Sequence, residues 1–131
     1  PPLSAWEQWR RDNFSAPELD NPAFSGATAD ADADGLTNAL EFALGLDPRT
    51  PGTTGAPALT LDANRHLTLS FVRRALPEIT YDVQASGDLQ TWISLWSSTG
   101  AANTADPVTV TDDVALDATS RRFLRLAITT P

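Results

Sequence analysis

Four acidic residues and a glycine are spaced regularly through one short segment of this chain, residues 30–41. Aspartates stand at its first, third and fifth positions, a glycine at the sixth and a glutamate at the twelfth (Asp30, Asp32, Asp34, Gly35, Glu41). This spacing fits the twelve-position loop in which alternate residues direct oxygen atoms at one Ca²⁺ ion. A chain with such a loop must fold so that these side chains converge, and the segment therefore predicts a calcium site.

The other positions of the segment complete the expected ligand set. Gly35 supplies the sharp turn, because a residue without Cβ accepts backbone angles that are closed to others. We expect Leu36 to offer its carbonyl oxygen, Asn38 a side-chain or water-mediated contact, and Glu41 both carboxylate oxygens.

The alternative interpretation of these residues is a solvated acidic turn. Three aspartates on alternate residues repel one another unless a cation or ample solvent lies between them, which favours the metal site. The sequence leaves open whether Asp20 or Asp47 adds a further ligand.

Helical signals flank the loop. Ser4 and Glu7 predict a capped helix that runs to about Asn13, with Trp6 and Trp9 on one face. We interpret these tryptophans as the surface that docks the helix, in preference to a ligand platform. Residues 14–26 are expected to be irregular, because prolines interrupt them.

A second helix is predicted directly after the loop, begun by a capping box of Asn38 and Glu41 and ended by Gly45 and Asp47-Pro48. The segment before the loop is a poor helix end. The predicted site is therefore half of an EF-hand, a single loop with only its outgoing helix.

From residue 58 onward, apolar residues alternate with polar ones in short runs separated by turns. These runs are residues 58–61, 66–72, 79–85, 92–97, 108–110 and 122–128. Six such strands predict a mainly β fold, a small antiparallel sandwich of fibronectin-III-like size. We expect a helical calcium-binding lobe at 1–48, a linker at 49–57 and the β-sandwich at 58–131.

Composition restricts the chemistry of the chain. The formal net charge of −8 argues against nucleic-acid binding, which needs clustered cations. Cysteine and lysine are absent and His66 is the only histidine, so thiol, Schiff-base and zinc chemistry lack their usual residues. No apolar run approaches the length of a membrane span. We therefore expect a protein that is not an enzyme.

The stretch from Asp32 to Pro48, DADGLTNALEFALGLDP, resembles the C-terminal calcium-loop module of many large exported bacterial proteins. Segments 69–74, 81–92 and 121–126 match the same pattern. The loop alone is also similar to those of dockerins and thrombospondin type 3 repeats, which bring at least a second loop. The resemblance implies an extracellular or cell-surface module at the C-terminus of a multidomain chain, whose partners are upstream domains of the same polypeptide.

Three functional hypotheses follow. The first is a non-catalytic, calcium-stabilised extracellular module with an anchoring or interaction role. The second is a carbohydrate-binding module of a secreted polysaccharide-active enzyme, in which Trp92 and Trp96 share one strand face and stack on a surface glycan. The third is calcium-triggered self-cleavage at an Asp-Pro bond, Asp47-Pro48 or Asp106-Pro107.

Overall fold

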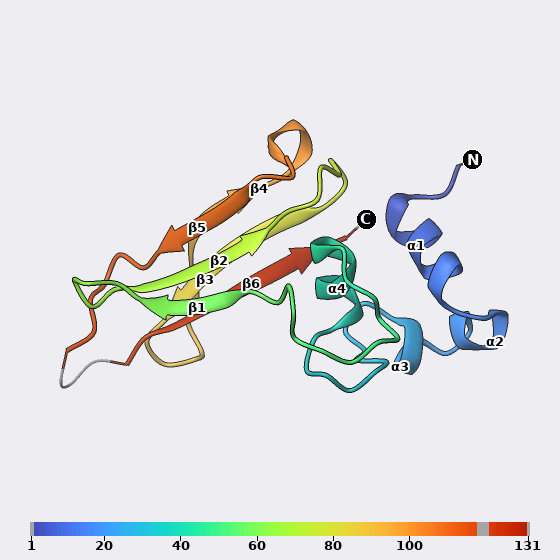
Figure 1. Cartoon of the computed structure of the whole chain (residues 1–131), viewed down its shortest axis with the longest axis horizontal. Helices are drawn as coiled ribbons and strands as arrows, with labels where there is room; N and C mark the ends of the chain where they lie inside the picture. The colour runs from blue at the N-terminus through green and yellow to red at the C-terminus, as the bar shows by residue number, and fades with distance from the viewer. Residues whose placement is uncertain (1, 118–120, 131) are drawn as a thin grey trace.

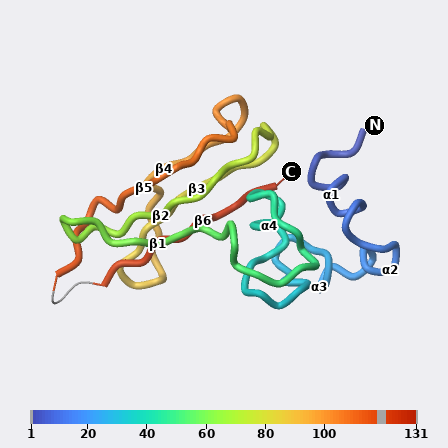
Figure 2. The backbone as a smooth tube through the Cα atoms, in the orientation of Figure 1, coloured from blue at the N-terminus to red at the C-terminus, as the bar shows by residue number. Residues whose placement is uncertain are grey.

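The computed structural model describes residues 2–117 and 121–130. Short helices occupy the N-terminal part and strands the remainder (Figure 1, Figure 2). The helices are α1 (Ala5–Asn13), α2 (Ala16–Leu19), α3 (Pro22–Ser25), α4 (Asn38–Leu44) and the 3-10 helix η1 (Gly100–Ala102). The strands are β1 (Ala58–Leu61), β2 (Leu67–Val72), β3 (Thr80–Ser86), β4 (Ile93–Ser98), β5 (Pro107–Thr111) and β6 (Phe123–Thr129).

The strands form two antiparallel sheets of three strands each, in the orders β1-β2-β5 and β4-β3-β6. Their inward residues alternate with outward ones, as the period of two in the sequence predicts. In β3, for example, Tyr81, Val83 and Ala85 are buried, whereas the residues between them are half-exposed. The β-rich, antiparallel prediction is confirmed, and the arrangement is consistent with a small β-sandwich.

One hydrophobic core joins the helices to both sheets. Trp6 of α1 and Phe42 of α4 belong to the same buried cluster as Phe71 of β2 and Tyr81 of β3. The aromatic rings of Trp6 and Phe42 meet edge to face at 5.3 Å, while Trp6 stacks on Trp9. The tryptophans of α1 therefore dock the helix, as the sequence indicated.

The C-terminal end of α4 is fastened to the sheets by side chains. The Tyr81 hydroxyl donates to the carbonyl of Ala43 at 2.6 Å and accepts from the backbone N–H of Arg74 at 2.9 Å. The Arg74 guanidinium donates to the carbonyl of Phe42 at 2.9 Å. The carbonyl of Phe42 also accepts from the N–H of Gly45 at 3.3 Å, so the bonds from Tyr81 and Arg74 supplement the helix end and attach it to the sheets.

Two local predictions for the helices are wrong. Residues 14–26 contain α2 and α3, because Ser15 and Asn21 cap their N-termini and a proline in the first turn of each needs no hydrogen-bond partner. Helix α4 is capped by Thr37, whose hydroxyl accepts from the N–H of Leu40, and not by a box of Asn38 and Glu41. The side chains of Asn38 and Glu41 do not cap the helix and are therefore free to make other contacts.

The expectation that Trp92 and Trp96 share one strand face is also wrong. Trp92 precedes β4, and the register of β4 against β3 shifts at Leu95, which adds one residue and reverses the alternation. Trp96 contacts Phe71 in the core, with ring centroids 5.9 Å apart. Trp92 instead lies beneath the guanidinium of Arg125, 3.9 Å from its ring centroid. The bulge therefore separates the two rings.

Among residues 2–117 and 121–130, the structure has no helix that is both long enough and apolar enough to cross a membrane.

Candidate metal centre

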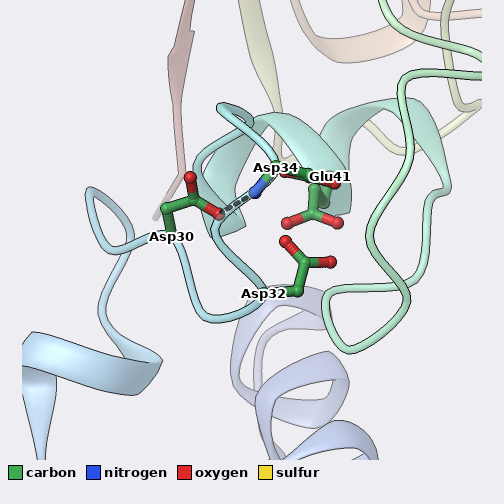
Figure 3. A group of neighbouring side chains, drawn as sticks. All are labelled: Asp30, Asp32, Asp34 and Glu41. Atoms are coloured by element: carbon green, nitrogen blue, oxygen red, sulfur yellow. Dashed lines mark hydrogen bonds between the residues drawn. The ribbon is translucent and has the colours of Figure 1, made fainter.

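The carboxylates of Asp30, Asp32, Asp34 and Glu41 converge. Each offers one oxygen atom, and these four atoms lie within 4.8 Å of one another. Figure 3 shows that the loop before α4 presents the three aspartates, whereas the helix itself presents Glu41 opposite Asp32. Such a group of oxygens could hold a metal ion.

Hydrogen bonds from the loop to its own carboxylates shape the turn. Asp30 accepts from the N–H of Asp34 at 3.2 Å (Figure 3) and from the N–H of Gly35 at 2.8 Å. Gly35 has a φ of +90°, and Ala33 has a φ of 57°. A side chain at position 35 would meet no neighbour, so glycine is favoured there by backbone angle and not by space.

The two ends of the loop are held together beside α4. The N–H of Asn38 donates to the carbonyl of Ala29 at 2.8 Å. The fully buried side-chain amide of Asn38 donates to the carbonyls of Phe24 and Gly26 at 3.0 and 2.9 Å. Asn38 therefore links the start of α4 to the end of α3 and fixes where the loop begins.

Burial and mutual repulsion alter the protonation of the cluster. Burial, and then the negative charges of Asp32 and Asp34, raise the pKa of Glu41 to about 8. Burial and the adjacent Asp34 also raise the pKa of Asp32, whereas the N–H of Leu36 lowers the pKa of Asp34. Ionised Glu41 is thus unfavourable here unless a cation lies beside it.

Several oxygens of this site are buried without a hydrogen-bond partner among the described residues. They are both carboxylate oxygens of Asp32 and Oε1 of Glu41, and Oδ1 of Asn38 at the start of α4 is likewise without a partner. Buried polar atoms are normally hydrogen-bonded, since a missing partner costs roughly 1–3 kcal/mol. Acceptors gathered without donors fit a cation, so the residues present suit a metal ion.

The other predicted ligands stand as follows. Leu36 donates its N–H to Oδ1 of Asp34 at 2.9 Å. Asp20 is exposed at the end of α2, outside the group of converging carboxylates. Asp47 accepts from the N–H of Arg49 and the hydroxyl of Thr50, both at 2.9 Å. Its negative charge nonetheless reaches the cluster and contributes to the raised pKa of Glu41.

Sequence reasoning missed the role of residues 48–52, which it placed in and beside a linker. The N–H of Gly52 donates to Oδ2 of Asp34 at 3.3 Å. Pro51 lines both a hollow of about 270 Å³ beside Glu41 and one of about 200 Å³ beside Asp32. The prolines and glycine predicted irregular backbone correctly, but they carry no signal for where that backbone lies.

The fold and this cluster together define a β-rich protein with four carboxylates that could hold a metal ion. Comparison of the chain with protein-family models, curated proteins and solved structures found no match. The resemblance to the calcium-loop module of exported proteins therefore stays a prediction.

Proposed function

We propose that residues 30–41 bind Ca²⁺ and that the protein is a non-catalytic, calcium-stabilised module. The observation that carries this proposal is the set of buried acceptors without donors, above all both oxygens of Asp32 and Oε1 of Glu41. A divalent cation supplies the attraction that these oxygens lack, and it offsets the repulsion among four neighbouring carboxylates.

The donor atoms favour calcium over other divalent ions. All of them are oxygens, whereas structural zinc sites use cysteine and histidine. Calcium accepts six to eight oxygens in flexible geometry, while Mg²⁺ demands a near-ideal octahedron and keeps several waters. The spacing of the ligands and the helix α4 after them support an EF-hand-like loop with an outgoing helix only.

The ion would join the two parts of the molecule. Glu41 lies on α4, whose end is bonded to Tyr81 of β3 and to Arg74 in the connection after β2, while the aspartates lie on the chain that leads from α3. An ion that bridges them strengthens the attachment of the helical lobe to a fibronectin-III-like sandwich. Binding to the folded state alone adds about 2.7 kcal/mol when free ion exceeds the dissociation constant a hundredfold.

An extracellular or cell-surface location suits such a site. Extracellular modules use calcium sites with dissociation constants of about 10⁻⁴–10⁻³ M, because the ion is abundant there. We infer an anchoring or interaction role at the C-terminus of an exported multidomain protein, next to upstream domains of the same polypeptide.

Calorimetric titration of the metal-free protein with Ca²⁺, Mg²⁺ and Zn²⁺ tests the proposal, together with thermal melting in each ion. We expect saturable binding of Ca²⁺ and a higher melting temperature with Ca²⁺ than with Mg²⁺. Glu41→Gln should fold but lose most of the calcium-dependent increase, whereas Glu7→Gln, which changes a half-exposed glutamate of α1, should keep it. Identical melting with and without Ca²⁺ would exclude a calcium-stabilised module.

A further inference from the structure

Residues 48–52, here called the strap, lie against the carboxylate cluster. The strap bonds to the cluster through the N–H of Gly52, which donates to Asp34. Pro51 lies beside the hollows next to Glu41 and Asp32, and Pro48 is itself fully buried. The strap is thus part of the wall around the candidate metal centre.

The oxygens behind this wall are closed off from solvent. Both oxygens of Asp32 and Oε1 of Glu41 are buried atoms. An ion in contact with these three oxygens would lie beside Pro51 of the strap, whereas the exposed Asp30 borders the cluster on a side that is open to solvent. The strap contains no helix or strand, so its position depends on its side-chain and backbone contacts, and its movement would change how far an ion beside Asp32 and Glu41 is covered.

Arg49 fastens the strap to the helices. Its guanidinium donates to both carboxylate oxygens of Glu18 at 3.0 and 3.1 Å and to the carbonyl of Asn13 at 3.3 Å. The same group lies over the rings of Phe14 and Phe24, 5.8 and 5.9 Å from their centroids. These contacts connect the strap to α1, α2 and α3 at a single residue.

Arg49 also lines the hollow beside Asp32, so its position bears directly on the site. The guanidinium of Arg49 is paired with the carboxylate of Glu18. The side chain of Arg49 is about half exposed, and that of Glu18 is 25% exposed. Arg49 is therefore placed to act through the backbone of the strap, and not as a counter-ion of the cluster.

We propose that Arg49 is a positioning residue of the metal centre, which holds the strap in place and thereby slows release of the bound Ca²⁺. The inference rests on the proposed function. The new element is a kinetic role for Arg49, a residue that lies outside the calcium loop at 30–41.

The test measures release of Ca²⁺ from loaded protein by stopped-flow mixing with a fluorescent chelator. Arg49→Met keeps the length of the side chain and removes its charge. We expect release about three- to tenfold faster than from the wild type, because an exposed ion pair and two cation–π contacts, each weak by itself, are lost. Arg11→Met, a matched change at an exposed arginine of α1, should leave the rate unchanged.

A second variant distinguishes an effect of the strap on calcium release from an effect of lower overall stability. Glu18→Gln removes the partner of Arg49 from the helix side, and the double variant should release the ion no faster than Arg49→Met alone. Hydrogen exchange of the Gly52 amide in loaded protein should accelerate in both variants by more than the loss of global stability in urea accounts for.

The outcomes are distinct. If wild-type protein binds Ca²⁺ but Arg49→Met releases it at the rate of Arg11→Met, the role of Arg49 is overturned and the calcium site stands. If wild-type protein binds no Ca²⁺, both proposals are overturned. Faster release confined to Arg49→Met and Glu18→Gln supports the strap.

Discussion

At the scale of single residues, Glu41 is the most unusual position of this chain. It is 1% exposed, it has three aspartates beside it, and one of its oxygens accepts no hydrogen bond from the described residues. A carboxyl in such surroundings favours its neutral form when no cation is present, and its ionised form when a cation is bound. Proton and metal therefore compete for the same side chain.

This competition predicts that metal-free protein becomes less stable as the pH rises from about 5 to 8. The pKa of Glu41 is raised from 4.5 to about 8 by folding, so the folded state keeps a proton that the unfolded state has lost in this range. The stabilisation that protonated Glu41 contributes to the folded state is complete below pH 4.5, the pKa of the unfolded chain, and is lost as the pH rises to about 8. Between these values the free energy of unfolding should fall by roughly 1.4 kcal/mol per unit of pH. Urea denaturation in calcium-free buffer measures it.

Saturating Ca²⁺ provides the control for this pH dependence. The bound ion replaces the proton, so the decline in the free energy of unfolding between pH 5 and 8 should vanish or reverse, and the affinity for Ca²⁺ should rise with pH. Metal-free protein that gains stability from pH 5 to pH 8 would contradict the assigned environment of Glu41.

At the scale of elements, α4 connects the metal centre to the sheets. The helix presents Glu41 to the cluster and, in the next two residues, offers the carbonyls of Phe42 and Ala43 to Arg74 and Tyr81. The middle and the C-terminal end of α4 are thus held by contacts outside the helix, which a helix of this length needs in order to be stable.

We expect Tyr81→Phe to destabilise the protein by about 2–3 kcal/mol. The substitution keeps the buried ring, but it leaves the buried carbonyl of Ala43 without its partner, at roughly 1–3 kcal/mol, and the part-buried N–H of Arg74 without its partner, at a smaller cost. Urea denaturation gives the loss, and the far-UV circular dichroism spectrum should stay unchanged. A loss below about 0.5 kcal/mol would show that the hydroxyl does not hold α4 in place.

At the scale of the whole molecule, the helical part and the sheets share one core. Trp6, Phe42, Phe71 and Tyr81 belong to a single buried cluster, so the helices cannot leave without exposing apolar surface of the sheets. Domains of this size with one core usually unfold in a single cooperative step.

We therefore predict one thermal transition both with and without Ca²⁺, and removal of the ion should move that transition as a whole. Tryptophan fluorescence and far-UV circular dichroism should give the same midpoint in each condition. If chelation instead produced a separate, earlier transition confined to the helices, the two parts would be independent domains.

The sequence by itself determined the features that depend on local chemistry. The alternation in residues 79–85 predicted a strand with one buried face, and the spacing of Asp30, Asp32, Asp34 and Glu41 predicted carboxylates that converge. Ser4 predicted the start of α1, where its hydroxyl accepts from the N–H of Glu7. Each of these signals lies within a few residues of the structure that it encodes.

Only the tertiary structure decided the features that depend on distant partners. The bulge at Leu95 reflects pairing with β3, and the place of the strap reflects contacts of Arg49 and Gly52 with residues 13–34. Burial of Glu41 likewise arises only when α4 lies against the chain beside it. Local spacing sets which oxygens can meet, but the surrounding packing sets whether they are closed off from water, because solvent is excluded only by segments far apart in the sequence.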